Sequence, residues 1–225
     1  MDSVLVDLHR RFDHALLTSE ADEKGIIRLC SEARQFHFYA VATNPVWVKL
    51  AADELRGSDV RVLSVAGFPL SASRSDVKLY EATKGVADGA SEIDMVANVG
   101  WLVSSRYREV QEEISLIRRG LPYNVVLKVI IEAPKLTPQQ QSEAVKCVIN
   151  GGAQFVKTCT GFFGGATVEQ VATLTAAAQG KIAVKASGGI RTLDQCRQLL
   201  KAGATRLGSS ASVSIMKELT ACDRS

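Results

Sequence analysis

The sequence predicts a single (β/α)8 TIM barrel that spans residues 1-225 as one domain and begins with a short N-terminal helix. Three observations predict it. Short β-branched runs recur along the chain, a loop rich in Gly, Ser, Thr or Asn and then a helical stretch follows each run, and no linker or change of composition separates the repeats. Eight such units favour a closed barrel over a doubly wound sheet, which shares the same alternation of elements.

The expected elements follow one another in a regular order. The leading helix carries Val4, Leu5, Leu8 and Phe12. The strands are expected at about residues 11-14, 37-42, 60-66, 91-97, 125-132, 153-158, 181-186 and 204-208. Helices are expected between them, and each falls just before a glycine suited to a left-handed conformation: Gly57, Gly89, Gly120, Gly151, Gly180 and Gly203.

Two helix starts support this division of the chain. Asn44 precedes Pro45, which places a capping residue before proline at the first helical position. Thr137 precedes a proline and is followed by Gln140, which combines a proline start with a capping box. We therefore expect helices to begin directly after Asn44 and Thr137.

Composition indicates a cytoplasmic globular protein. Of the 225 residues 46% are apolar, which supplies a core. No apolar run approaches the roughly 20 residues that cross a bilayer, and the N-terminus lacks the pattern of a signal peptide. The net charge of +3 comes from 27 basic and 24 acidic residues that are interspersed, unlike a clustered nucleic-acid surface. We expect neither a membrane nor a nucleic acid as partner.

Cysteine and histidine usage argues against a metal site. The cysteines number five, are scattered and never form a CxxC pair, so neither a disulfide framework nor a zinc knuckle is indicated. His9, His14 and His37 lie near the N-terminus without an HxH or HxxxH pair. We expect reduced thiols and no metal.

Charged residues alternate with apolar ones in the fourth and fifth expected strands. The face of a barrel strand that meets the helices must be apolar, so a charged residue between such positions points inward. In the fourth strand, Ile93 and Met95 take the helix side and turn Asp94 inward. In the fifth, the apolar residues at 127, 129 and 131 face the helices and leave Lys128 and Glu132 inside.

The next two strands each end on an inward lysine. Phe155 and Lys157 share the inner face of the sixth strand, and Ala183 and Lys185 share that of the seventh. Both lysines lie just before loops, at the carboxyl rim where barrel enzymes carry their active sites. Four successive strands thus direct charged side chains to a common interior.

A rim lysine of this kind is a candidate Schiff-base nucleophile. An amine must be neutral to attack a carbonyl, and burial together with a neighbouring ammonium favours the neutral form. Two plainer interpretations stay open: the lysines pair with Asp94 and Glu132 as a structural network, or the strand faces are shifted by one residue. Two rim lysines on adjacent strands repel each other, which favours a function for the whole set.

Glycine-rich loops follow the last three expected strands. Backbone N–H groups in such loops can approach an anion, and barrels commonly bind phosphate at the loops after strands seven and eight. Taken singly, these glycines are also ordinary turn residues, and Arg191 beside them is equally a solvated charge. The candidate substrate- and phosphate-binding residues are Thr160, Gly161, Gly164, Gly188, Gly189, Gly208, Ser209 and Ser210.

Two other side chains are secondary candidates. Cys159 alternates onto the inner face after Lys157, where a small pocket-lining thiol is the better interpretation than a nucleophile. Asp13, beside His14 at the end of the first strand, is a candidate to assist the site.

The chain resembles the deoxyribose-phosphate aldolases over nearly its whole length, from FDHALL at 12-17 to TRLGSSASVSI at 205-215. The most specific matches are EIDMVANVG at 92-100, LKVIIE at 127-132, FVKTCTGF at 155-162, VKASGGIR at 184-191 and the spaced GFPL, K and EA of 67-82. The resemblance implies a cofactor-free class I aldolase that reversibly cleaves 2-deoxy-D-ribose 5-phosphate to D-glyceraldehyde 3-phosphate and acetaldehyde, in deoxyribose phosphate catabolism. The family's habits also suggest a homodimer.

By that resemblance, four residues have catalytic roles. Lys157 of FVKTCTGF forms the Schiff base, and Lys185 of VKASGGIR is the second cation that keeps it uncharged. Asp94 of EIDMV acts with a bound water in proton transfer, supported by Lys128. The residue chemistry and the family pattern therefore select the same side chains.

The chain departs from the family at a few positions. Ala42 stands in VATNP where many members carry a cysteine that lines the substrate pocket. Ala133 and Pro134 follow LKVIIE where the family usually has a small polar residue and then Cys or Gly, and Ser71 and Ser75 stand where Gly and Thr are common. The short tail lacks the C-terminal tyrosine of some longer members. These changes put the range of accepted aldehydes in question.

Two other functions stay open at this point. Another Schiff-base barrel aldolase, acting on a keto-sugar phosphate, would use the same rim lysines. A phosphate-binding barrel without activity is the alternative outside enzymes, but Lys157, Lys185 and Asp94 are retained, which argues against it. In each case we expect a small sugar phosphate as the ligand.

Overall fold

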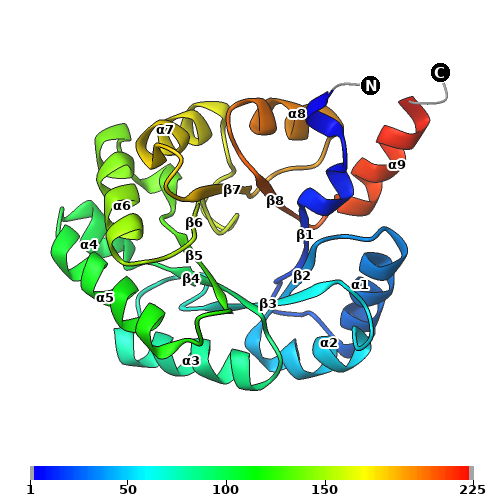
Figure 1. Ribbon diagram of the computed structural model, residues 1–225, viewed down its shortest axis with the longest axis horizontal. Helices are drawn as coiled ribbons and strands as arrows, with labels where there is room; N and C mark the ends of the chain where they lie inside the picture. Colours follow the sequence, from blue (N-terminus) through cyan, green and yellow to red (C-terminus); the bar gives the residue numbers. More distant parts are fainter. Residues whose placement is uncertain (1–2, 223–225) are drawn as a thin grey trace.

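The computed structural model describes residues 3–222, in which eight parallel strands form a closed barrel surrounded by helices (Figure 1). Each strand pairs with the next along the chain, and β8 pairs with β1 to close the barrel. This confirms the predicted fold class. The strands are β1 (Phe12–Leu16), β2 (Ala40–Thr43), β3 (Arg61–Ala66), β4 (Glu92–Val96), β5 (Val126–Ile130), β6 (Phe155–Lys157), β7 (Ala183–Ser187) and β8 (Arg206–Ser209).

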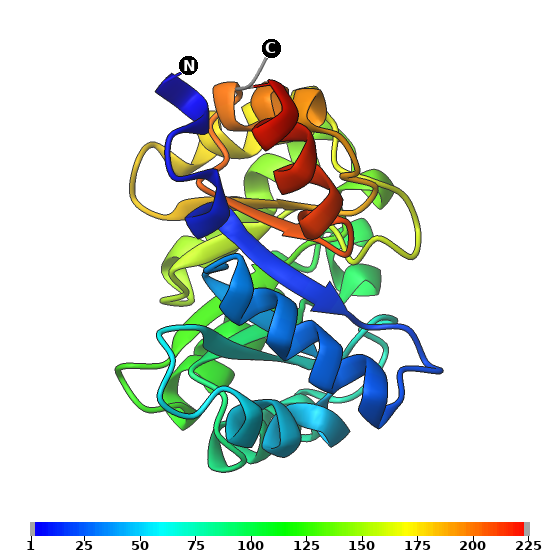
Figure 2. The same ribbon diagram turned by 90° about the vertical axis from the view of Figure 1, so that its right-hand side faces the viewer.

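The helices form a ring outside the strands, and the N-terminal segment lies beside α8 and α9 at one end of the molecule (Figures 1 and 2). None of the helices within residues 3–222 is long and apolar enough to cross a membrane. The α-helices are α1 (Glu23–Gln35), α2 (Val48–Glu54), α3 (Ser75–Ala87), α4 (Val99–Val103), α5 (Tyr107–Gly120), α6 (Pro138–Asn150), α7 (Val168–Ala178), α8 (Leu193–Lys201) and α9 (Ser212–Cys222). The 3-10 helices are η1 (Ser3–Leu5), η2 (Leu8–Arg11), η3 (Pro45–Trp47) and η4 (Ala133–Lys135).

The main hydrophobic core lies between the strands and the helices. Ile93 and Met95 of β4 are fully buried in it, as is Leu127 of β5. Successive side chains of a strand point to opposite faces. Burial of these apolar residues against the helices therefore turns Asp94 and Lys128 into the barrel, as the alternation predicts.

The predicted N-terminal helix is wrong in detail. The segment forms two short 3-10 helices, η1 and η2, rather than one α-helix that reaches Phe12. Asp7 between them adopts a left-handed conformation with φ of 54°, which interrupts any continuous helix. Phe12 already belongs to β1, where its ring packs edge-on against Phe38 at 5.8 Å.

Two predicted strands extend too far because of left-handed residues at their ends. The second strand begins at Ala40 rather than at residue 37, since His37 has φ of 53°. The fifth ends at Ile130 rather than at residue 132, since Glu132 has φ of 53° and precedes η4. Such a conformation cannot continue a β-strand, so Glu132 lies at the rim and not inside the barrel.

The predicted helix ends hold at some positions and fail at others. Thr137 and Gln140 form the expected capping box of α6. Asn44 precedes η3, but its side chain donates to the Thr18 carbonyl instead of capping. Gly57, Gly89, Gly180 and Gly203 have positive φ as predicted, whereas Gly120 lies within α5 and Gly151 is right-handed.

Close packing explains the glycine at 151. A Cβ there would meet Ile114 Cγ2 at 2.4 Å, so α5 and α6 could not pack as they do with a larger residue. The left-handed conformation after α6 falls instead on Gly152, with φ of 84°.

Candidate active site

A cavity of about 330 Å³ opens at the carboxyl ends of the strands, on the side of β1, β2, β6, β7 and β8. This is the rim at which barrel enzymes bind substrates. Ala15, Leu17 and Ala42 give the cavity an apolar part of its lining, and the rim lysines Lys157 and Lys185 give it a charged part. The other lining residues are Asp13, Thr18, Thr160, Gly161, Phe162, Ser187, Gly188, Gly189, Ile190, Arg191, Gly208, Ser209 and Ser210.

Asp94 is the centre of the charged side chains below this cavity. Its Oδ2 accepts hydrogen bonds from Lys157 Nζ at 2.8 Å and from Lys185 Nζ at 2.7 Å. Its Oδ1 accepts one from Lys128 Nζ at 3.1 Å. The register of the strands produces this arrangement, since Asp94 pairs with Lys128 across β4 and β5, and Lys157 pairs with Lys185 across β6 and β7.

Three further charged residues complete the cluster. Asp13 of β1 contacts Lys185 and lies 4.0 Å from Lys128, and Glu92 of β4 also contacts Lys128. Arg206 Nη1 of β8 lies 2.8 Å from Asp13 Oδ1 and 3.6 Å from Glu92 Oε2. Its guanidinium carbon lies 3.4 Å from the centre of the Tyr39 ring, a cation–π contact.

The two aspartates of this cluster, Asp13 and Asp94, are ionised. Burial by itself would raise the pKa of Asp94, but the surrounding lysines hold it well below its usual range. Burial likewise opposes ionisation of Asp13, yet Lys185 and the neighbouring cations lower its pKa to about 2. Both side chains are therefore permanent anions near neutral pH, and both accept hydrogen bonds rather than donate them.

The lysines differ in how strongly the carboxylates hold them. Burial opposes the charge on Lys128, but the carboxylates around it raise its pKa. Burial lowers the pKa of Lys185, although Asp13 and Asp94 oppose the shift. Within residues 3–222, Lys157 contacts a single carboxylate, that of Asp94, and it borders the cavity with a side chain only 4% exposed. Of the three, Lys157 combines access to the cavity with the fewest anionic contacts.

The loops after β6, β7 and β8 surround the other side of the cavity. Thr160, Gly161, Gly188, Gly189 and the residues from Gly208 to Ser210 all border it. A Cβ at Gly208 would lie 3.0 Å from Ser187 Cβ and 3.2 Å from Lys185 Cε, so a side chain there would crowd both residues. Gly164 does not border the cavity, because it packs against Pro134 instead.

The alternation of β4 and β8 also selects two residues that the sequence reasoning did not name. Glu92 lies two positions before Asp94, on the same face of β4. Arg206 precedes Leu207, which is fully buried in the outer core, so Arg206 turns inward. Both could have been predicted from the alternation of side chains along a strand, if it had been applied to the first residue of β4 and of β8.

Glu132 and Cys159 do not take the places expected of them. Glu132 Oε2 accepts the Thr160 N–H at 3.1 Å, and none of its hydrogen bonds reaches the lysines. Cys159 is fully buried outside the cavity lining, with its Sγ 2.9 Å from the Ser187 carbonyl. Burial raises the pKa of the Cys159 thiol to about 11, so it is protonated and fills space.

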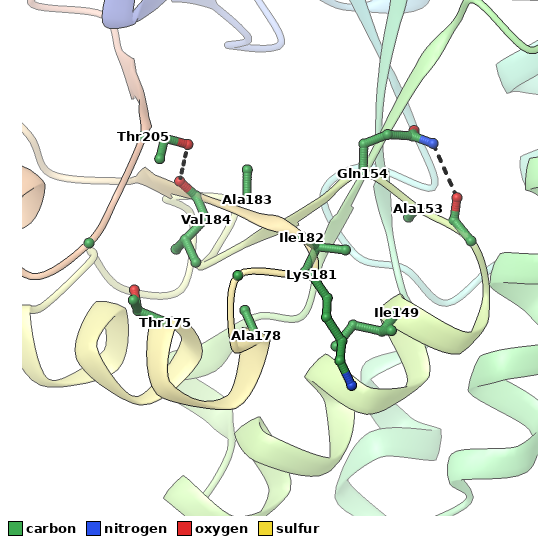
Figure 3. Close-up of a pocket in the computed structure, with 13 residues that line it drawn as sticks. Ile149, Ala153, Gln154, Thr175, Ala178, Lys181, Ile182, Ala183, Val184 and Thr205 are labelled. Carbon is green, nitrogen blue, oxygen red and sulfur yellow. Dashed lines mark hydrogen bonds between the residues drawn. The ribbon is translucent and has the colours of Figure 1, made fainter.

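A larger cavity of about 610 Å³ lies at the opposite end of the barrel, between the starts of β6 and β7 and the helices α6 and α7 (Figure 3). The lining residues that Figure 3 labels are mainly aliphatic. Among them, Thr205 Oγ1 donates a hydrogen bond to the Val184 carbonyl at 3.4 Å. Lys181 is its one ionisable side chain among the described residues. Within residues 3–222, no group of three or more His, Cys, Asp or Glu is placed to hold a metal ion.

Comparison with known proteins identifies the family. The deoxyribose-phosphate aldolase of Natranaerobius thermophilus is 48% identical over 206 residues, which cover 91% of this chain and 94% of that protein. That of Lysinibacillus sphaericus is 43% identical over 213 residues, with 94% and 96% covered. The chain belongs to the deoxyribose-phosphate aldolase family. No protein-family model matches it.

Solved structures agree with this family assignment. The tetrameric deoxyribose phosphate aldolase of Aeropyrum pernix has a TM-score of 0.89 at 32% identity, with 96% of this chain and 92% of that chain covered. A second structure, described as an aldolase, has a TM-score of 0.92 at 39% identity, with 97% and 98% covered. The barrel of a deoxyribose-phosphate aldolase is thus preserved along nearly the whole chain.

The departures from the aldolase family pattern differ in their distance from the cavity. Ala42 of β2 borders it directly, so the small side chain leaves room where the resemblance implies a thiol. Pro134 packs against Gly164, and a Cβ on that glycine would meet Pro134 Cβ at 3.0 Å. Pro134 therefore acts on the loop after β6 and not on the cavity itself.

Proposed function

We propose that this chain reversibly cleaves 2-deoxy-D-ribose 5-phosphate to D-glyceraldehyde 3-phosphate and acetaldehyde, with Lys157 as the Schiff-base residue. The observation that carries the proposal is the position of Lys157 at the cavity floor. Its amine contacts one carboxylate, while Lys185 beside it contacts Asp13 and Asp94. An amine with little anionic stabilisation, next to an ammonium, is the one most readily uncharged and nucleophilic.

The reaction follows from this arrangement. The neutral amine of Lys157 adds to the substrate aldehyde C1, and loss of water leaves an iminium that can accept an electron pair. Because acetaldehyde has two carbons, the bond that breaks joins C2 to C3. Its electrons form an enamine while the C3 hydroxyl loses a proton and becomes the aldehyde of glyceraldehyde 3-phosphate. Protonation of the enamine at C2 and addition of water to the iminium release acetaldehyde.

Asp94 and its partners would carry the protons in these steps. A carboxylate with so low a pKa keeps a proton poorly, but it holds the amines of Lys157 and Lys185 on one oxygen. A proton can therefore pass between the amines of Lys157 and Lys185 and the substrate, while Asp94 orients the two amines and stays ionised. Lys128, on the other oxygen, fixes the orientation of the carboxylate.

The phosphate would lie at the loops after β7 and β8. Gly188 and Gly189 both have positive φ, at 91° and 71°, so this turn depends on glycine. Their backbone lies at the cavity with that of Ser209 and Ser210, and Arg191 lies beside them. Ser209 Oγ already donates to the Ile190 carbonyl at 2.7 Å, so its backbone is the part available to an anion.

Borohydride capture tests the proposal. The protein is incubated with acetaldehyde, reduced with sodium borohydride and mapped by peptide mass spectrometry. We expect an ethyl adduct on Lys157 that is absent from Lys157→Leu, together with loss of the cleavage of deoxyribose 5-phosphate in a coupled NADH assay. An adduct on Lys185 would reverse the assignment of the two lysines. Rapid cleavage of a keto-sugar phosphate, with none of deoxyribose 5-phosphate, would instead favour the alternative aldolase.

Location and assembly are further parts of the proposal. A cytoplasmic location fits the buried thiols of Cys30, Cys147, Cys159 and Cys196, which have no disulfide partner among the described residues. A homodimer stays a prediction, and the relative from Aeropyrum pernix is described as tetrameric. Light scattering coupled to size exclusion would measure the mass of the assembly.

A further inference from the structure

The charged cluster inside the barrel has more basic side chains than carboxylates. Every member is buried, with at most 9% of its side chain exposed. A net charge is costly in such surroundings, so a neutral cluster is the most stable state. The carboxylates are Asp13, Glu92 and Asp94, and the basic side chains are Lys128, Lys157, Lys185 and Arg206.

Arg206 is the basic member that cannot release its proton. A guanidinium stays charged throughout the pH range of proteins, whereas a lysine amine can become neutral when buried. Arg206 is held by Asp13 at 2.8 Å and Glu92 at 3.6 Å, between the rings of Tyr39 and Phe155. With its charge fixed, three carboxylates can balance only two lysines, and the third amine is left neutral.

We propose that Arg206, at the floor of the barrel, is the fixed positive charge that keeps one lysine of the cluster neutral and so makes Lys157 reactive near neutral pH. This inference rests on the proposed function. Arg206 does not touch Lys157 and acts on it through the charge balance, so it is a positioning residue of electrostatic kind. Burial lowers the pKa of Lys185 as well, but Asp13 and Asp94 both contact Lys185, whereas Lys157 borders the cavity with one carboxylate contact, so we assign the neutral amine to Lys157.

Two other charged residues, Arg61 and Glu132, lie at the edge of the cluster, and each interacts with one of its members. Arg61 Nη1 lies 3.5 Å from Glu92 Oε1, but its side chain is 43% exposed and water screens its charge. Glu132, beyond the end of β5, interacts electrostatically with Lys157, but no ion pair joins the two side chains in the described part of the chain, and burial raises the pKa of Glu132. Cys159 near Lys157 is a protonated thiol. Arg206 pairs with Lys185 across β7 and β8 and contacts the rings of Tyr39 and Phe155. The partly exposed side chains of Arg10 and Arg61 contact the same Tyr39 ring.

The pH dependence of kcat/KM for deoxyribose 5-phosphate tests the inference, because its acid limb reports the protonation of the nucleophile in the free enzyme. Arg206→Gln removes a positive charge, so the acid limb should move to higher pH, by about one pH unit. Glu92→Gln removes a negative charge and should move the limb to lower pH. The double variant restores the balance and should return the limb toward its original position. The rate of borohydride capture, measured across the same pH range, should shift in parallel.

Arg206→Lys is a graded variant of the same position. A buried lysine there can release its proton, so the acid limb should move in the same direction as in Arg206→Gln but less far, even if the rate falls. If Arg206 and Glu92 had only a structural role, their variants would lower kcat/KM without moving the pH of the acid limb, or would all move it in the same direction. Either result overturns the inference. If Arg206→Gln does not fold, as judged by its melting curve, the test depends on Glu92→Gln alone. An acid limb at lower pH supports the inference, and an unchanged limb overturns it.

Failure of this inference differs from failure of the proposed function. If the unaltered protein gives no adduct at Lys157, the proposed function itself is wrong. If it gives the adduct and the acid limbs do not move in opposite directions, only the role of Arg206 is wrong.

Discussion

Two buried lysines of this molecule, Lys78 outside the barrel and Lys157 inside it, have opposite electrostatic surroundings. Lys78 of α3 is fully buried, and its Nζ lies 3.0 Å from Glu113 Oε1 and 2.9 Å from the Val96 carbonyl. Glu113 of α5 also accepts the Asn98 N–H at 3.0 Å. This site therefore pairs one cation with one carboxylate and satisfies both with neutral hydrogen bonds.

The cluster around Lys157 differs in charge balance and in access. It has more basic groups than carboxylates, and Lys157 borders a cavity, whereas Lys78 borders none of the cavities described above. A balanced, closed pair is a structural tie that joins α3, α5 and the end of β4. An unbalanced cluster with an opening leaves one amine available for chemistry. Burial alone therefore does not distinguish a reactive lysine from a structural one.

The largest expected effect is on turnover at Lys157. Lys157→Met removes the nucleophile and should lower kcat by roughly a thousandfold or more, since residues that form a covalent intermediate are not readily replaced. The melting temperature should hold, because Lys157 is the uncharged amine of the cluster and its loss leaves the three carboxylates balanced by Lys128, Lys185 and Arg206. If Lys157→Met kept substantial turnover, Lys157 would not be the nucleophile, and the contrast between a reactive Lys157 and a structural Lys78 would be wrong.

The next effect is on stability at Lys78. Lys78→Met leaves the buried carboxylate of Glu113 without its cation and should cost about 3–5 kcal/mol of unfolding free energy in urea denaturation. The matched control is Lys84→Met on the same helix, whose exposed pair with Asp88 should contribute at most about 1 kcal/mol. The folded fraction of Lys78→Met should still trap acetaldehyde. Loss of trapping in fully folded protein would mean that Lys78 also acts on the cluster.

Acid should weaken the barrel cluster at its carboxylates. Asp13 has a folded pKa of about 2 against an ordinary value of 3.8, so its ionised form favours the folded state. That contribution is complete above about pH 4 and is lost as the pH falls toward 2, on the order of 2 kcal/mol. Urea denaturation from pH 5 to pH 2 measures it, and Asp13→Asn should flatten that part of the curve. An unchanged slope in the variant would assign the acid loss to other carboxylates.

The smallest expected effect concerns Glu132, a buried carboxylate just beyond the end of β5. Its Oε2 fixes the Thr160 N–H, and its Oε1 has no hydrogen-bond partner in the described structure. Glu132→Ala should raise KM about tenfold by loosening the loop that carries Thr160, because one charge-assisted hydrogen bond is worth about 1.5 kcal/mol. Glu132→Gln can still accept the N–H and should recover most of the loss. If both variants lose kcat equally, Glu132 takes part in proton transfer instead.

Much of the fold and of the site could be predicted because both follow from alternation along single strands. Ile93 and Met95 on the helix side require that Asp94 point inward, and the same period places Lys157 and Lys185. Backbone exceptions could not be predicted in this way. The left-handed Glu132 ends β5 early, and no propensity of glutamate indicates that conformation.

The sequence by itself determined that Asp94, Lys128, Lys157 and Lys185 face the inside of the barrel, since each strand has a period of two and an apolar outer face. Only the tertiary structure decided which of them meet and in what proportion. The register between strands placed Asp94 on three lysines, and closure of β8 on β1 brought Arg206 to Asp13. The charge balance of the site is a sum over strands far apart in the chain, and no single strand contains it.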